Sequence, residues 1–391
     1  MKKELFVFFI SLWLLFPAYA GTAIEAEIDA LFGTLQYYNI RDRCRIILRL
    51  GYEEAPEAVE PLCEILTNDI HYEIRGSAAL ALGDIRSAKA VPAFCEALKE
   101  EKYPDVRVDV ARALGYIDSE KAVPALCEAL KEDEKRAVRM EAVEALGEIG
   151  SKKAVPPLCK ALKEDEEADV REAAAWALKD IRSRKVVPVL CDVIDDEDSY
   201  IGAVAVRILG IIGDKRAEPP IRNAFESRSC NYLRREAAGA LGRMKSEKAV
   251  DILIETLYEK DPGVRLASAY ALGEIKSPKA IDPLHSILYD RNEDIRAGGI
   301  RALANFNTKR TFNAVRGALN DEASVVRVSA IYALCKYPTK EKLTLLIPFI
   351  NDKEHRVRFR AYLYLSRVRN APPEITEAVD EYKEKYMKKE E

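Results

Sequence analysis

Apolar residues recur along most of this chain with the spacing of short amphipathic helices. The stretch Asp105–Arg136 shows the pattern most clearly, because it contains two apolar sets separated by a polar turn. The first set is Val106, Val110, Leu114 and Ile117, and the second is Val123, Leu126, Cys127 and Leu130. Spacings of three and four residues place each set on one side of a helix. The pattern predicts two helices joined by a short turn.

The same unit is repeated along the chain. The 32 residues Ala137–Ala168 match Asp105–Arg136 at 19 positions without a gap, and weaker copies follow at intervals of 31 or 32 residues. One marker position defines eleven units: Gly51, Gly83, Gly115, Gly147, Lys179, Gly210, Gly242, Gly273, Ala304, Cys335 and Ser366. A period of this length predicts a solenoid, in which each unit buries its apolar face against its neighbours.

Small and polar residues around the marker suggest how helices pack and start. Glycine there either allows two helices to approach closely or begins the turn that ends the first helix. Four residues later stands a side chain able to cap the second helix, such as Ser119 or Ser151. Pro92, Pro124, Pro156 and Pro188 fall near the first turn of that helix, where a missing N–H costs least.

The motif DVR–x5–ALG–x–I–x–S–x–KAVP–x–L resembles the HEAT-like repeats first associated with phycobilisome lyases. The resemblance covers about residues 40–390. It implies an all-α fold, an α-solenoid forming a right-handed superhelix of about eleven two-helix repeats. It also implies that the first helices lie outside and that the second helices line the concave side. Repeats of this kind serve mainly as interaction surfaces.

The two ends of the chain differ from the repeats. Residues 1–20 have the features of a cleaved signal peptide: Lys2 and Lys3, the apolar stretch 5–16, and a small-x-small site ending at Ala20. The apolar stretch is shorter than the roughly 20 residues that span a bilayer, so we expect export to the periplasm or medium and no transmembrane anchor. Residues 21–39 predict a capping helix, 40–370 the repeats, and 371–391 a last helix with a charged tail.

The repeat pattern weakens at residues 195–235. Gly202 stands where other units have arginine, Glu218 replaces the apolar residue before a proline, and the loop 226–231 has no counterpart elsewhere. We interpret this segment as an irregular joint within one solenoid.

Charge and cysteine content narrow the functional classes. The net charge of −4, with acids and bases interleaved, argues against a nucleic-acid partner. Cys63, Cys95, Cys127, Cys159 and Cys191 recur every 32 residues at one equivalent site. Stacked helices lie roughly 8–10 Å apart, too far for these cysteines to form disulfides with one another. We interpret them as small core residues.

Two basic columns run through the repeats. Arginine stands eight residues before the marker in most units, for example Arg75, Arg107 and Arg139, and we expect it to tie neighbouring loops through acids such as Asp133. A second column opens the second helices: Lys89, Lys121, Lys153, Lys185, Lys248 and Lys279. It is either a solvated row balanced by nearby acids or a continuous basic surface that binds a polyanion or the cell envelope.

Nothing in the sequence indicates catalysis. The three histidines, His71, His285 and His355, are scattered, and none forms the His-Glu pairs that bind iron in deoxyhypusine hydroxylase, an enzyme with HEAT-like repeats. No nucleotide-binding loop, nucleophile elbow or zinc-protease motif occurs. We therefore predict no catalytic residue, no metal site and no cofactor.

The positions that vary between repeats are the candidates for binding. The residue after the cysteine column points away from the apolar stripe, toward the side expected to be concave. The candidate positions are Glu96, Glu128, Lys160, Asp192, Asn223 and Glu255. We predict an exported, monomeric, non-enzymatic scaffold that binds a protein or peptide there. The alternatives are a module that binds polyanions or the envelope through the lysine column, and a non-catalytic subunit of an envelope enzyme.

Overall fold

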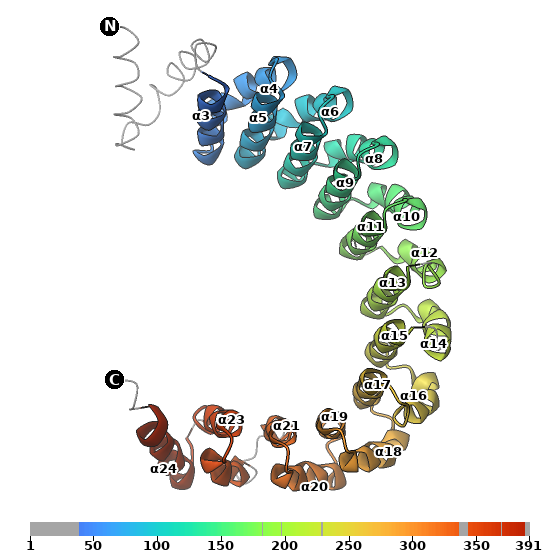
Figure 1. Ribbon diagram of the computed structural model, residues 1–391, viewed down its shortest axis with the longest axis vertical. Coiled ribbons are helices and arrows are strands. Elements are labelled where there is room, and N and C mark those ends of the chain that lie inside the picture. Colours follow the sequence, from blue (N-terminus) through green and yellow to red (C-terminus); the bar gives the residue numbers. More distant parts are fainter. Residues whose placement is uncertain are drawn as a thin grey trace. The chain divides into compact units, whose positions relative to one another are not determined.

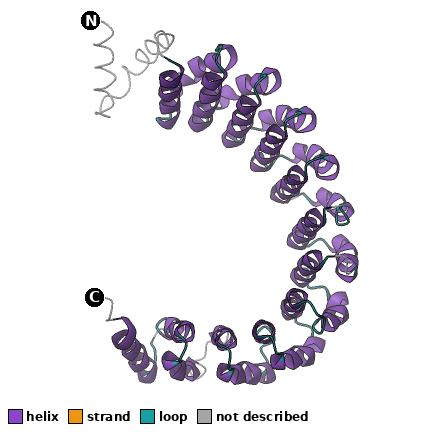
Figure 2. Cartoon of the chain, viewed as in Figure 1, coloured by secondary structure: helices purple, strands orange, loops and turns teal. Residues whose placement is uncertain are grey.

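The computed structural model describes residues 39–181, 183–196, 198–227, 230–335, 343–368 and 370–387. The predicted signal peptide and all but Asn39 of the predicted capping helix lie outside these residues. The described chain consists of helices joined by short loops, without a strand (Figure 2). It forms two compact units, the first ending at Val186 and the second beginning at Val187. The all-α solenoid prediction is confirmed.

In the first unit the repeats form pairs of a first and a second helix, as predicted. The first helices are α3 (Ile40–Tyr52), α5 (Tyr72–Ile85), α7 (Pro104–Ile117), α9 (Arg136–Ile149) and α11 (Ala168–Ile181). The second helices are α4 (Val59–Asn68), α6 (Val91–Glu100), α8 (Val123–Glu132) and α10 (Val155–Glu164). Short 3₁₀ turns that the sequence did not predict come before the second helices: η2 (Pro56–Ala58), η3 (Ala88–Ala90), η4 (Glu120–Ala122), η5 (Lys152–Ala154) and η6 (Arg184–Val186).

The second unit repeats this alternation with shorter second helices. Its first helices are α13 (Ser199–Ile212), α15 (Asn231–Arg243), α17 (Pro262–Ile275), α19 (Glu293–Leu303), α21 (Ser324–Cys335) and α23 (His355–Leu365). Its second helices are α12 (Val187–Asp192), α14 (Glu218–Glu226), α16 (Val250–Thr256), α18 (Ile281–Ser286) and α20 (Lys309–Gly317), with α24 (Pro373–Tyr382) last. Its 3₁₀ segments are η7 (Lys215–Ala217), η8 (Glu247–Ala249), η9 (Pro278–Ala280), η10 (Ile287–Tyr289), η11 (Ala318–Asn320) and η12 (Thr344–Asn351), and the π-turn η13 (Lys383–Met387) follows α24.

The marker glycines let the first helices pack closely. A Cβ added to Gly115 would lie 3.1 Å from the Cα of Ala145, and one added to Gly210 would lie 2.7 Å from the Cα of Ala240. The left-handed residue that ends the first helix comes three positions later, as at Asp118. Close approach is therefore the correct one of the two interpretations of this glycine.

Side-chain capping of a second helix occurs at Thr308, which accepts a hydrogen bond from the backbone N–H of Thr311 in α20. In other repeats the predicted residue caps the 3₁₀ turn before the second helix. Ser151 accepts a hydrogen bond from the backbone N–H of Lys153, and Asp214 accepts one from Arg216. Ser119 makes no side-chain cap bond. The left-handed residue and the 3₁₀ turn set the chain's direction there.

The first helices form the inner row of each unit, which corrects the predicted orientation. Within the first unit α5, α7 and α9 line the inner side of the curve, and within the second unit α15, α17 and α19 do the same (Figure 1). The reason is the size of the side chains between neighbouring helices. Glycine and alanine bring consecutive first helices together, while bulkier side chains keep the second helices farther apart. The second helices therefore form the outer, convex row, and not the concave side.

The irregular stretch has local structural causes. The backbone carbonyl of Ile194 lies where a side chain at Gly202 would start, so the loop before α13 takes the place of the usual arginine. Glu218 accepts a hydrogen bond of 2.6 Å from the hydroxyl of Ser246 in the next repeat. A polar contact thus replaces the apolar one found in other units.

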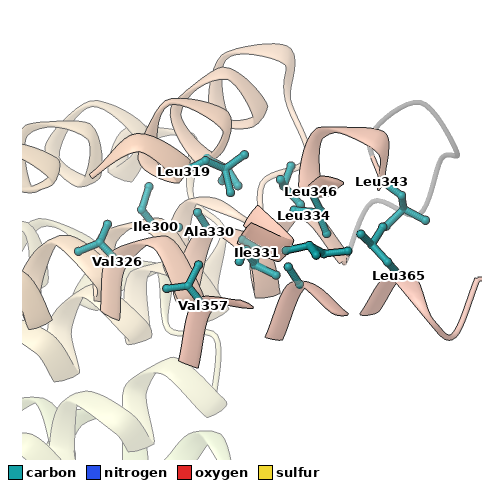
Figure 3. Packing of buried hydrophobic residues seen from close by; sticks show 14 of the residues in the cluster. Ile300, Leu319, Val326, Ala330, Ile331, Leu334, Leu343, Leu346, Val357 and Leu365 are labelled. Carbon is teal, nitrogen blue, oxygen red and sulfur yellow. The ribbon is translucent and has the colours of Figure 1, made fainter. Parts of the chain in front are cut away.

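The end of the second unit has a continuous apolar core. Leu334 of α21, Leu346 of η12 and Val357 of α23 are fully buried together (Figure 3). Ile375 and Tyr382 of α24 pack into the same cluster, as predicted for a last helix that covers the final repeat.

Candidate functional site

The arginine column ties consecutive repeats together. Arg139 is 6% exposed and donates two hydrogen bonds to Asp165 of the next repeat, at 2.9 and 3.0 Å. Its third contact is the carbonyl of Asp133 in its own preceding loop, at 3.1 Å. Arg75 and Arg107 make the equivalent contacts with Glu101 and Asp133. The expected inter-repeat ladder is present, and it accounts for these residues without a ligand.

The cysteine column consists of free, half-buried thiols. Burial raises the pKa of the Cys127 thiol to about 11, and burial followed by the nearby charge of Glu60 does the same for Cys63. Such thiols stay protonated at neutral pH and are poor metal ligands. They pack at the edge of the core, and the interpretation as core residues is therefore correct only in part.

The binding residues expected from sequence lie on the outer row. Glu96, Glu128, Lys160, Asp192, Asn223 and Glu255 are all exposed on second helices. The structure does not bring them into one site, since Glu96, Glu128 and Lys160 each line a separate groove. The grooves at Glu128 and Lys160, of about 540 and 630 Å³, are lined by acids and bases together. A mixed lining of this kind selects no particular charge.

Several members of the lysine column are paired with acids of the preceding repeat. Lys153 lies 3.2 Å from Glu120, and Lys279 lies 3.1 Å from Asp251. Lys89 lies 3.9 Å from Glu60. Lys121, Lys185 and Lys248 are also exposed. Because basic and acidic side chains alternate along this edge, the arrangement favours a solvated row over a continuous basic surface that binds anions.

A different groove lies on the inner row, between α9 and α11. It measures about 580 Å³, and its base is formed by Met140, Ala173 and the half-buried indole of Trp176. The indole N–H donates to Glu172 at 3.3 Å, and the ammonium group of Lys179 lies 5.3 Å from the ring centroid. Five carboxylates surround this base: Glu144, Glu148, Asp169, Glu172 and Asp180.

Burial, and after it the charge of neighbouring carboxylates, raises the pKa values of several acids on this face. Burial, and then the negative charge of Glu141, raises the pKa of Glu144. Burial, and then the charges of Glu144 and Glu141, raises the pKa of Glu148. On the neighbouring helix α7, burial raises the pKa of Asp109 to about 6, although Arg112 opposes the shift. The carboxylates would gain from a cation placed among them.

Sequence reasoning missed this groove because it placed the first helices outside. One signal was visible in the sequence, because Trp176, Tyr270 and Tyr332 occupy equivalent positions of three first helices. Tyr270 accepts a hydrogen bond from Arg301 at 3.1 Å. Tyr332, however, is 48% exposed, so this set of positions also faces solvent.

The repeat geometry agrees with a family of known proteins. A family model described as HEAT repeats matches residues 28–109, 91–179, 155–229, 218–304 and 281–366, which together make up most of the chain. The chain belongs to the HEAT-repeat family. No curated protein sequence matches it.

Solved structures with the same fold include karyopherins. Kap121p bound to Pho4p has a TM-score of 0.63 at 14% identity, covering 97% of this HEAT-repeat protein and 48% of the Kap121p chain. Importin beta has a TM-score of 0.61 at 15% identity, with 85% and 53% covered. Kap95p, whose binding induces the switch loops of RanGDP to adopt the GTP-bound conformation, has a TM-score of 0.60 at 13% identity, with 84% and 53% covered. This chain thus spans about half the length of these karyopherins, and the likeness establishes the fold alone.

Within the residues described above, no helix is long and apolar enough to cross a bilayer. Histidine, cysteine and carboxylate side chains in the same residues form no cluster of three or more that could hold a metal ion.

The irregular joint contains one thiol unlike those of the cysteine column. Cys230 precedes the first residue of α15, where the backbone N–H of Leu233 lowers the pKa of its thiol. Burial, the second-largest effect, opposes this shift, while the hydroxyl of Ser199 and the charge of Arg235 add to it. Cys230 is therefore the more reactive kind of cysteine.

Proposed function

We propose that this HEAT-repeat protein is an exported, non-catalytic scaffold that binds a protein or peptide partner along its first helices. Export is supported by the basic, apolar and small-x-small pattern of residues 1–20. N-terminal sequencing of protein from its native source tests it, with Gly21 as the expected first residue. A start at Met1 would contradict cleavage.

We assign the binding surface to the first helices because of the charge of the inner groove. Among the described lining residues of the groove between α9 and α11, every charged side chain is a carboxylate. The grooves between second helices contain both signs and neutralise themselves. A surface of one sign beside exposed aromatic groups selects among partners, whereas a self-neutralised one does not.

The surface is testable by photo-crosslinking in the native host. A photoreactive amino acid replaces Tyr116 or Tyr332, the exposed tyrosines of α7 and α21, or else Glu128 or Glu255 on the second helices. We expect one partner band at the tyrosine positions and none at the glutamate positions. Equal yields from both sets, or adducts at the glutamates alone, would refute the inner-row assignment.

A further inference from the structure

The chain itself compensates the charge of the groove between α9 and α11 only in part. Asp169 is paired with Arg136 at 2.7 Å, and Asp180 with Lys179 at 2.9 Å. Glu144 and Glu148 are exposed, and among the described residues neither has an ion pair. The charges of Arg112 and Arg86 oppose the raised pKa values of Glu144 and Glu148, but Arg112 is bound at two points by Glu141, at 2.8 and 3.0 Å. Two carboxylates thus remain available at the rim.

The groove also has an apolar part. Trp176, Met140, Ala173 and Ala177 make up the apolar side chains of the lining. The position of Lys179 over the indole shows that this ring already has a cation at one face. A ligand that combines positive charge with a small apolar group would use both parts of the groove.

The spacing of the carboxylates identifies the form of that ligand. They do not converge as metal ligands do, since no described cluster could hold a metal ion. Glu144 and Glu148 are four residues apart on α9, which places them roughly 6 Å apart along the helix. An extended peptide advances about 3.3–3.6 Å per residue, so cationic side chains two residues apart would reach both carboxylates.

Resting on the proposed protein-binding function, we propose that this groove binds a basic extended segment of the partner, in which arginine or lysine alternates with apolar residues. The cationic side chains pair with Glu144 and Glu148 at the rim. The apolar side chain between them packs against Trp176 and Met140. The partner is therefore a protein with an exposed basic strand or tail.

Trp176 allows a direct test in the chain that begins at Gly21. The sequence has two tryptophans, and Trp13 lies in the predicted signal peptide, so Trp176 is the only indole of this chain. The probe is an octapeptide of alternating arginine and leucine with blocked ends, and the control peptide has glutamate in place of arginine. We expect a saturable change in Trp176 emission with the arginine peptide and none with the glutamate peptide. An equal response to both peptides would overturn the proposal.

Matched variants distinguish binding in the groove from non-specific attraction of the peptide to acidic side chains. We expect Glu144→Gln with Glu148→Gln to weaken binding of the arginine peptide at least tenfold. The control, Glu132→Gln with Glu164→Gln, removes two exposed carboxylates from the outer row and should change affinity less than twofold. Equal weakening by both pairs would refute the groove. So would Trp176 emission that varies with the concentration of the chain alone, because a second copy would then be the occupant.

Failure here is distinguishable from failure of the proposed function. Crosslinking at Tyr332 reports on the second unit and does not depend on the groove in the first. A partner captured at Tyr332 together with no peptide binding at Trp176 would remove this inference and leave the scaffold function standing.

Discussion

Arg139 and Asp165 form a two-point ion pair between successive repeats, with both side chains less than 10% exposed. Breaking a buried pair of this kind leaves a charge without compensation. We expect Arg139→Met to lower the free energy of unfolding by about 3 kcal/mol, measured by urea denaturation followed by circular dichroism. Arg136→Met is the control, since its pair with Asp169 is 57% exposed on the arginine side, and it should cost less than about 1 kcal/mol. Equal effects would show that the ladder does not hold the repeats together.

The close approach of first helices predicts a clear difference between two glycines. A Cβ on Gly210 would lie 2.6 Å from the Cβ of Ala240, whereas one on Gly317 of α20 would meet nothing within 4 Å. We expect Gly210→Ala to destabilise the fold by about 2 kcal/mol through overpacking. Gly317→Ala should be neutral or stabilising by up to about 1 kcal/mol, because alanine favours a helix. Thermal unfolding of both variants checks this, and a stabilised Gly210→Ala would contradict the packing.

Comparison of sequence with structure shows where local pattern suffices. Val106, Val110 and Leu114 predicted α7, and the spacing of the arginine column predicted the ladder, because both depend on residues within one or two repeats. The orientation of the rows depends on how closely whole helices approach one another. Gly115 and Ala113 indicate that close approach, but the family resemblance implies that the first helices lie outside.

The candidate groove was harder to predict for a different reason. Glu144 of α9 and Glu172 of α11 are 28 positions apart and share a lining only because two first helices pack together. Each looks like an ordinary exposed acid in its own repeat. The departures from the repeat, such as tryptophan at 176 where the preceding repeat has Glu144, were the residues that mattered.

Asp109 predicts a pH-dependent contribution to stability. Its pKa of about 6 in the folded chain exceeds the ordinary value of 3.8, so the ionised carboxylate opposes folding. This penalty disappears as the pH falls from about 7 to below 4. We expect Asp109→Asn to raise the free energy of unfolding at pH 7 by about 1–2 kcal/mol, and by much less at pH 4.

Its control is Asp84→Asn on α5, at an exposed position. Urea midpoints at the two pH values provide the comparison. A destabilised Asp109→Asn at pH 7, or a gain that does not depend on pH, would contradict the raised pKa.

The thiols should differ in reactivity. The N–H of Leu233 and the hydroxyl of Ser199 favour the thiolate of Cys230, whereas burial raises the pKa of Cys127 to about 11. Alkylation by iodoacetamide at pH 7.5, followed by mass spectrometry, should modify Cys230 several times faster than Cys127. Ser199→Ala should slow the reaction at Cys230 alone. Faster labelling of Cys127 would contradict the described environments.

Carboxyl footprinting tests the inner-row account most directly. The full chain, alone and with the partner that crosslinking identifies, is labelled by carbodiimide and glycine ethyl ester and analysed by mass spectrometry. We predict that the partner protects Glu144 and Glu148 on the first helices and leaves Glu96 and Glu128 on the second helices unchanged. Protection of Glu96 and Glu128 with continued labelling of Glu144 and Glu148 would contradict the account.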